Sequence, residues 1–261
     1  MSIFKNGVAL DSLEVWEAHA GPKHPNQWAD GRSAKETARA WLEAGAGNLP
    51  REIASVLETH ASFGALETWE AEPEVKLPFD KYRGETRNSD LAILGQDRMG
   101  SLLIAVEAKA DESFSETIGD TLAKALERKL KSSASKGIAR VEQLARFLFG
   151  PHRKGEPSLT KIRYQLLTAC AGALCEAQRR ECNRALMLVH EFVTTDTNDK
   201  KHAKNATDLN TFIKRISHGS VEALSAGEIV GPFEVPGMPL LSESPPLFVG
   251  KVSRNLRDSS A

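Results

Sequence analysis

Two acidic residues and one lysine are spaced so that they could hold a metal ion. Asp90 opens a short apolar run over residues 91–94, and Glu107 and Lys109 follow a second run over residues 102–106. Because side chains alternate between the faces of a strand, Glu107 and Lys109 share a face. If the two runs pair as an antiparallel hairpin, the start of the first lies opposite the end of the second. We therefore expect Asp90, Glu107 and Lys109 to converge at one end of a sheet.

Such a cluster suits the hydrolysis of phosphodiester bonds. Two carboxylates can hold Mg²⁺ through their oxygens, and the carbonyl of Ala108 could supply a further ligand. The metal would neutralise charge on the phosphate and lower the pKa of a bound water. Lys109, whose pKa a nearby metal would lower, could orient or deprotonate that water, or stabilise developing charge on the phosphate. We expect Asp90 and Glu107 to bind Mg²⁺, with Mn²⁺ as an alternative ion.

The composition is that of an ordinary globular protein. The chain has 261 residues, of which 41% are hydrophobic and 26% charged, which excludes a fibrous or disordered chain and favours one α/β domain. Its 34 basic and 35 acidic residues give a net charge of -1, so any site for a polyanion must be local. With no secretory signal and no long apolar segment, we expect a cytoplasmic protein without a membrane partner. Cysteines 170, 175 and 182 are expected to be reduced thiols.

Hydrophobic periodicity predicts the elements that must position the cluster. Helices are expected over residues 33–45, 50–61, 162–180 and 209–216, with two more in 115–148, interrupted at 132–137. Strands are expected over residues 66–79, 185–193 and 247–252, beside a hairpin whose loop spans 95–100. Pro73 and Pro78 would confine the first of these strands to a sheet edge or a bulged path.

The two ends of the chain lack the hydrophobic periodicity of its middle. Residues 1–30 show no sustained period, which predicts an irregular arm on the domain surface. Ser33 and Glu36 have the spacing of a capping box at the start of the first helix. Residues 31–218 would form the domain, and the proline-rich residues 219–261 would form an extension that ends in a strand packed on the same domain.

The motif residues resemble the D…(D/E)xK signature of the PD-(D/E)XK nuclease superfamily. Asp90 is followed, after a spacer, by Glu107-Ala108-Lys109, while Ser89 stands where members commonly have proline. The expected order of helix, hairpin, helix and strand is similar to the restriction-endonuclease-like core. A closer resemblance, to an uncharacterised bacterial family of this superfamily, spans roughly residues 25–216. The segments that carry it are Gly31-Arg32-Ser33-Ala34, Trp41, Pro73-Glu74, Val106-Glu107-Ala108-Lys109, Asp111-Glu112-Ser113-Phe114, Arg163-Tyr164-Gln165-Leu166-Leu167 and Val189-His190.

This resemblance implies an α/β fold whose central mixed β-sheet is flanked by helices. It implies a Mg²⁺-dependent endonuclease acting on DNA, for which a homodimer is expected. Members usually add an acid from the preceding helix, where Glu52 borders the apolar face and Glu58 points away from it; Glu74 on the first strand is a rival. By the same resemblance Arg163 would contact phosphate and Gln165 would support the metal site or contact a base.

Each of these residues also has a structural interpretation. Asp90, Glu107 and Lys109 could form a salt-bridged strand end, and Arg163 could cap a neighbouring carbonyl. His190 is favoured as a hydrogen-bonded residue at the core edge, and Arg32 as a surface residue. Basic residues could form a DNA-binding face or a solvated one; they are Lys124, Arg128, Lys129, Lys131, Lys136 and Arg140. The alternatives to a nuclease are a non-catalytic module that binds nucleic acid or a partner, and a hydrolase of small phosphoesters.

Overall fold

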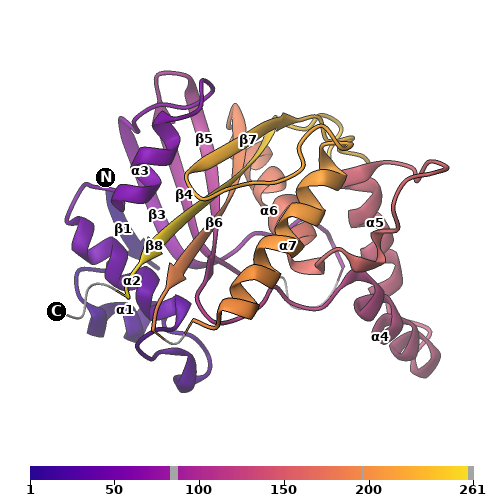
Figure 1. Cartoon of the computed structure of the whole chain (residues 1–261), viewed down its shortest axis with the longest axis horizontal. Coiled ribbons are helices and arrows are strands. Elements are labelled where there is room, and N and C mark those ends of the chain that lie inside the picture. The colour runs from indigo at the N-terminus through magenta and orange to yellow at the C-terminus, as the bar shows by residue number, and fades with distance from the viewer. Residues whose placement is uncertain (83–87, 196, 258–261) are drawn as a thin grey trace.

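The computed structural model describes residues 1–82, 88–195 and 197–257. Its centre is an eight-stranded mixed sheet in the order β2-β1-β3-β4-β5-β6-β8-β7, flanked by helices (Figure 1). The strands are β1 (Ser2–Lys5), β2 (Val8–Ala9), β3 (Thr68–Lys76), β4 (Asn88–Asp97), β5 (Gly100–Lys109), β6 (Arg184–Val193), β7 (Glu228–Phe233) and β8 (Leu247–Asn255). The helices are α1 (Leu13–Ala20), α2 (Ser33–Ala44), α3 (Arg51–Glu58), α4 (Ile118–Lys131), α5 (Gly137–Phe149), α6 (Tyr164–Arg179) and α7 (Asp199–Ile216).

The predicted hairpin is confirmed, with a shorter turn than expected. β4 and β5 pair antiparallel from Asp97↔Gly100 to Leu91↔Val106. The loop prediction over 95–100 is wrong because Gly95 lies within β4, where a Cβ would come within 3.0 Å of Leu66. Here glycine marks close packing rather than a turn.

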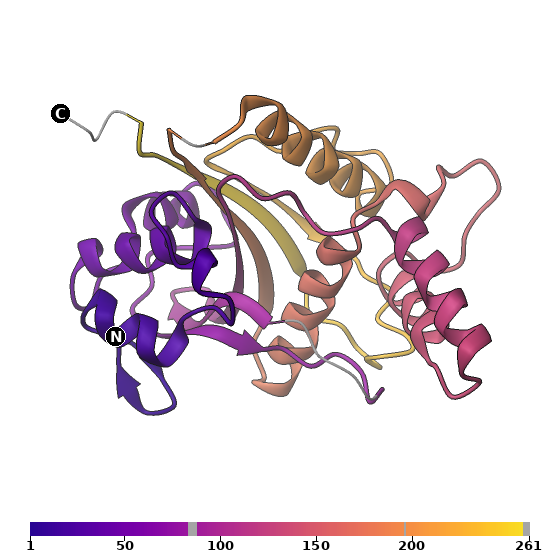
Figure 2. The same cartoon turned by 90° about the horizontal axis from the view of Figure 1, so that it is seen from below.

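Alternation along β5 divides the core between the two faces of the sheet. Leu102, Ile104 and Val106 belong to the apolar cluster that contains Ala38 and Trp41 of α2 and the buried residues of α3. Leu103 and Ala105 belong to the cluster formed with α5, α6 and α7. Figure 2 shows these two groups of helices apart, with the α4–α5 pair at the end of the molecule away from the N-terminus. By the same alternation, Glu107 and Lys109 lie on the face of Leu103 and Ala105, which packs against α6.

The topology places the ends of several strands at one edge of the sheet. β5, β6 and β8 run parallel to one another, with Lys109↔Glu191 and Glu191↔Ser253 among their paired positions. Since β4 is antiparallel to β5, the beginning of β4 lies at the same edge as the carboxyl ends of these strands. Open α/β sheets bind ligands at this kind of edge.

The irregular arm predicted for residues 1–30 is wrong. The segment contains β1, which pairs parallel with β3, and α1, whose Trp16 is buried. Ser12 caps α1, its hydroxyl accepting the N–H of Val15 at 3.2 Å. Only two residues of β1 pair with β3, and α1 has eight residues. Segments this short give too few repeats to show a period.

Three further expectations need correction. Ser33 does not cap α2: its hydroxyl donates to Glu112, while Glu36 accepts the N–H of Gly31 at 2.8 Å. α7 begins at Asp199 rather than near residue 209, because its first half is polar and carries little apolar period. β7 was missed since Gly231-Pro232 interrupts its pattern. The two-helix prediction for 115–148, and the strands over 185–193 and 247–252, are confirmed by α4, α5, β6 and β8.

The half of β3 that contains Pro73 lies at an open edge of the sheet, as predicted for this strand. β1 pairs with β3 only at Glu70 and Ala71, so β3 beyond them has no strand of the described residues on that side. Glu74 has φ +48°, in the left-handed region that non-glycine residues rarely occupy. Lys5 supports this stretch, its ammonium donating to the carbonyls of Pro73 and Glu74 at 2.9 and 2.8 Å.

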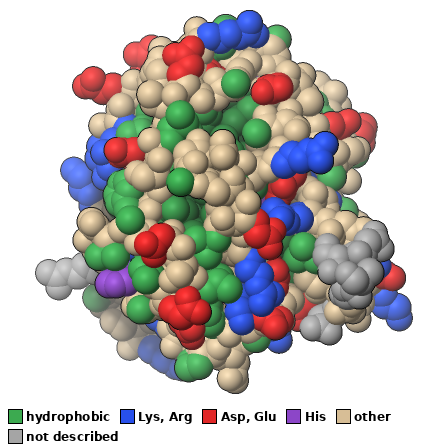
Figure 3. All heavy atoms as spheres, turned by 90° about the vertical axis from the view of Figure 1, so that its left-hand side faces the viewer, with side chains coloured by type: hydrophobic (Ala, Val, Ile, Leu, Met, Phe, Trp, Pro, Cys, Tyr) green, Lys and Arg blue, Asp and Glu red, His purple; other side chains and the backbone are tan. Residues whose placement is uncertain are grey.

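The surface shows no dominant charge on the face that carries the N-terminal helices. Lysine and arginine side chains are interspersed there with aspartate and glutamate (Figure 3), as the net charge of -1 suggests. None of the helices in the described ranges combines the length and apolarity that crossing a bilayer requires.

Replacing Asp97 by alanine should strongly destabilise the protein. Asp97 is buried, pairs with the buried Arg184, and accepts the N–H groups of Gly64 and Met99 at 3.0 and 2.8 Å. Its removal leaves a buried guanidinium without its ion partner, which costs about 3–5 kcal/mol. Urea denaturation measures this loss against Arg98→Ala, an exposed neighbour expected to change stability by less than about 0.5 kcal/mol. Equal stability of the two variants would contradict a stabilising role for the buried Asp97–Arg184 pair.

Candidate active site at the end of the hairpin

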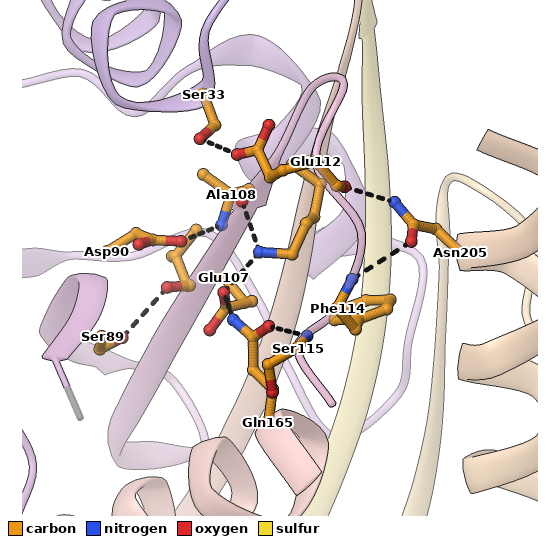
Figure 4. A network of polar contacts seen from close by, with 12 residues as sticks. Ser33, Ser89, Asp90, Glu107, Ala108, Glu112, Phe114, Ser115, Gln165 and Asn205 are labelled. Atoms are coloured by element: carbon orange, nitrogen blue, oxygen red, sulfur yellow. Dashed lines mark hydrogen bonds and ion pairs between the residues drawn. The ribbon is translucent and has the colours of Figure 1, made fainter. Parts of the chain in front are cut away.

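The structure brings Asp90, Glu107 and Lys109 together at the end of the hairpin. The Asp90 carboxylate on β4 accepts the backbone N–H of Ala108 on β5 at 2.6 Å. The ammonium of Lys109 donates to Glu107 Oε1 at 2.6 Å and to the Ala108 carbonyl at 3.0 Å (Figure 4). Glu107 and Lys109 are 2% and 4% exposed, so the charges lie inside the protein and must compensate one another.

Nearby carboxylates keep Lys109 charged. Burial by itself lowers the pKa of the Lys109 ammonium, but the charges of Glu107, Asp90 and Glu112 outweigh it and raise that pKa above its ordinary value. The lowering of this pKa that we expect beside a bound metal ion stays a prediction. The oxygens of Glu107 and Ala108, both expected as metal ligands, here converge on the lysine cation.

Gln165 holds Glu107 from the helix side of the sheet. It is buried near the start of α6, and its amide N–H donates to Glu107 Oε1. The amide oxygen of Gln165 accepts the backbone N–H of Ser115 at 3.0 Å. A glutamine amide can make both bonds only in one orientation, so α6 fixes the Glu107 carboxylate and ties it to the loop after β5.

That loop closes over the cluster and is anchored at both sides. Glu112 accepts the hydroxyl of Ser33 and the backbone N–H of Asp111, the latter at 3.1 Å. Asn205 on α7 accepts the N–H of Phe114 at 3.3 Å and donates to the Glu112 carbonyl at 2.9 Å. The Phe114 ring thereby lies with its centroid 5.4 Å from the Lys109 ammonium, a cation–π contact.

The cluster opens into a cleft made of two adjoining hollows. The smaller, of about 300 Å³, is lined by Asp90, Glu107, Lys109 and the first residues of α2. The larger, of about 560 Å³, lies between the start of β4 and α6 and includes Tyr164. Residues that line both are Pro22, Gln27, Glu74, Asp90, Ser115 and Gln165. A substrate in this cleft could therefore touch the cluster from either side.

The structure does not bring Glu52 to this site, which corrects our expectation of a metal ligand. Glu52 Oε1 lies 2.9 Å from His190 Nε2 and 3.4 Å from Arg254. His190 pairs in register with Ala108, so it lies on the face of the sheet opposite Glu107. Glu58 on α3 is exposed.

Of the three upstream acids, Glu74 is the one in the cleft. It stands between the paired positions Pro73↔Leu91 and Val75↔Ser89, which places it beside Asp90. Its carboxylate accepts the side-chain amide of Asn88 at 3.0 Å. A residue in the left-handed region at such a position is a candidate for function, since strained backbone gathers at active sites.

The basic residues considered for phosphate binding already have acidic partners. Arg163 donates to Asp208 at 2.8 Å and to the Ser115 carbonyl at 2.9 Å. Arg32 makes two bonds to Asp111, at 2.7 and 2.8 Å. These contacts favour the structural interpretation of both arginines.

The expected basic stretch over residues 124–140 is also partly neutralised. Arg140 pairs with Asp80 at 2.7 Å, and Lys124 pairs with Glu116. Lys129 donates to the Ser133 carbonyl. α4 therefore does not present an unbroken row of free cations to a nucleic acid.

The oxygen ligands at this site are of the kind that Mg²⁺ prefers, but they are too few to complete its coordination. Asp90, Glu107 and the Ala108 carbonyl supply the hard oxygen ligands that Mg²⁺ prefers. Across residues 1–82, 88–195 and 197–257, no three side chains of His, Cys, Asp or Glu are grouped to hold a metal. The remaining ligands would have to be water and substrate oxygens, which is how Mg²⁺ is commonly bound.

The sequence prediction assigned no role to two contributors to the site, although Glu112 lies in one of the segments that carry the family resemblance. Glu112 adds a third carboxylate to the field at Lys109, and Asn205 anchors the loop from a distant helix. The position of Glu112 three residues after Lys109 was a usable signal. No local pattern marks Asn205, because its role depends on how α7 packs.

A family described as Domain of unknown function (DUF6946) matches residues 9–255, nearly the whole chain. No curated protein and no solved structure matches it.

The Glu52–His190 pair predicts a loss of stability in mild acid. Burial lowers the pKa of His190, and its hydrogen bond to Glu52 offsets this only in part. Below about pH 6.5 the unfolded chain binds a proton that the folded chain does not, so stability falls as pH falls, by up to about 1.4 kcal/mol per pH unit. Glu52, whose pKa is also lowered despite burial, adds a loss only at more acidic pH.

Urea denaturation between pH 7 and 5.5 measures the effect. His190→Gln, whose amide can still donate to Glu52, should lose less stability than wild type over this range. Identical pH slopes for the two proteins would show that His190 titrates normally in the folded state.

Proposed function

The chain belongs to the family of DUF6946, a domain of unknown function, and we propose that it is a Mg²⁺-dependent nuclease that hydrolyses phosphodiester bonds of DNA. The observation that carries this proposal is the convergence of Glu107 Oε1 and the Ala108 carbonyl on one cation, beside Asp90, in the wall of a cleft. A carboxylate oxygen and a carbonyl oxygen focused on one cation, next to a substrate-sized hollow, suit metal-assisted hydrolysis.

The arrangement of the surrounding elements supports the same proposal. α3 precedes the antiparallel strands β3, β4 and β5, after which α6 packs on the sheet and β6 lies parallel to β5. This order is similar to the restriction-endonuclease-like core, whose motif hairpin corresponds to β4 and β5. The resemblance concerns fold, so the reaction has to be argued from the site.

Each residue of the proposed site would have its own role in the reaction. Asp90, Glu107 and the Ala108 carbonyl would hold Mg²⁺, which when bound neutralises phosphate charge and lowers the pKa of a water. The Ala108 N–H fixes the Asp90 carboxylate, and Gln165 fixes that of Glu107. The hydrogen bonds to Glu107 and to the Ala108 carbonyl use two of the three donors of the Lys109 ammonium, so a third N–H can orient the attacking water or a phosphate oxygen.

One observation favours a different function on the same fold. The Lys109 ammonium already satisfies the oxygens of Glu107 and Ala108, as a purely structural salt bridge would. In that case the protein would be a non-catalytic module that binds nucleic acid or a partner through the cleft. Binding that ignores Mg²⁺ and survives Glu107→Gln would support this alternative.

Cleavage assays with matched variants test the nuclease proposal. Purified protein is incubated with supercoiled, linear and single-stranded DNA in Mg²⁺ or Mn²⁺. Asp90→Asn, which keeps an acceptor for the Ala108 N–H, and Lys109→Ala should each lower the rate by about 10²–10⁴-fold, because each removes a group that acts on the reacting phosphate or water. Lys154→Ala, an exposed lysine outside the cleft, should cut like wild type.

Thermal unfolding of each variant separates loss of activity from loss of fold. Asp90→Asn should melt close to wild type, whereas Lys109→Ala leaves buried acidic charge and should melt lower. If wild type cuts no nucleic acid and calorimetry detects no Mg²⁺ or Mn²⁺ binding, the nuclease proposal is wrong.

A further inference from the structure

The reacting groups of the proposed site lie deep in the cleft. The elements that form its walls are α2, the loop after β5 and α6, and side-chain contacts join them to one another. Arg32 and Asp111 pair at 2.7 Å and join the start of α2 to the loop after β5. On the other side, the bond from Ser115 to Gln165 joins that loop to α6 at 3.0 Å. With Lys109 only 4% exposed, a substrate phosphate must enter between these walls rather than rest on a flat surface.

The larger hollow has the chemistry of a nucleotide site. Its lining includes Phe79, Tyr164 and Asn88. It also includes Lys23 and Lys76, which can attract a phosphate. Aromatic rings beside cations are how proteins bind unpaired nucleotides, because every base offers a face for stacking.

The size of the hollow and the charge around it argue against a duplex. A volume of about 560 Å³ is that of a pocket for one small ligand. Duplex binding relies on many cations along two backbones, whereas the net charge here is -1 and Lys124 on α4 already pairs with Glu116. An unpaired strand can instead pass one nucleotide at a time into a recess.

We propose that the substrate is a single nucleic-acid strand, with one base against Tyr164 in the larger hollow and the adjoining phosphate at Asp90, Glu107 and Lys109. The cutting step rests on the proposed nuclease function, whereas the strand site does not. Tyr164 immediately precedes Gln165 on α6, so the base site and the acidic cluster are held by the same helical turn. Six lining residues shared by the two hollows make the path continuous.

The side chain of Tyr164 packs partly against the apolar core on this face of the sheet, so thermal unfolding of each Tyr164 variant accompanies the binding measurement. The backbone N–H of Tyr164 donates to the Glu116 carbonyl at 2.9 Å, a bond that does not need the ring. Tyr164→Ala removes the stacking surface, and Tyr164→Phe keeps it. The pair therefore isolates the ring from the backbone.

Fluorescence anisotropy measures binding of a labelled 20-nucleotide DNA, as a single strand and as a blunt duplex, with Ca²⁺ in place of Mg²⁺. An RNA strand of the same sequence forms a third arm. Wild type should bind at least one of the two single strands about tenfold more tightly than the duplex. Tyr164→Ala should weaken that binding about tenfold, as loss of one base stack does, while Tyr164→Phe should change it less than about twofold.

The outcomes separate the two proposals. Equal or tighter binding of the duplex, no binding of any strand, or an unchanged affinity for Tyr164→Ala would overturn the single-strand site, even if DNA is cut. Tight single-strand binding that depends on Tyr164, without cleavage in Mg²⁺ or Mn²⁺, would support this site and overturn the nuclease function. Preference for RNA over DNA would support the strand site and identify which strand it takes.

Discussion

The buried pair of Glu107 and Lys109 is the constraint around which the rest of the site is organised. Two charges taken out of water destabilise a protein unless they meet each other and further hydrogen-bonding groups. Here the 2.6 Å ion pair is completed by the Ala108 carbonyl on the ammonium and by Gln165 on the carboxylate. Asp90 adds a second negative charge that further stabilises the ammonium. A cluster this costly to bury is more easily explained by function than by stability.

The sheet separates this cluster from a second polar group. On the face that packs against α6, carboxylates surround Lys109 beside the cleft. On the opposite face, Glu52 pairs with the fully buried His190, whose position in the sheet is fixed by pairing with Ala108. The alternation of side chains along the paired strands β5 and β6 therefore places the candidate site on one face of the sheet and the Glu52–His190 pair on the other.

Much of this arrangement was predictable where local pattern and geometry agree. The alternation after residue 102 placed Glu107 and Lys109 on one face, and the hairpin placed Asp90 near them. The helical acid was not predictable, because Glu52 borders an apolar face that packs on the other side of the sheet. Ser33 showed a capping pattern but serves Glu112, a contact made across 79 residues. Local spacing carries no information about such distant contacts.

The metal-dependent site is tested most directly by whether a divalent cation binds at these oxygens. A crystal soaked in Mn²⁺ would reveal the ion by its anomalous scattering. We expect one ion held by Asp90, Glu107 and the Ala108 carbonyl, with the Lys109 ammonium displaced from that carbonyl. Density without an ion there, with Lys109 still bonded to Glu107 and Ala108, would contradict a metal-dependent site and leave a structural ion pair.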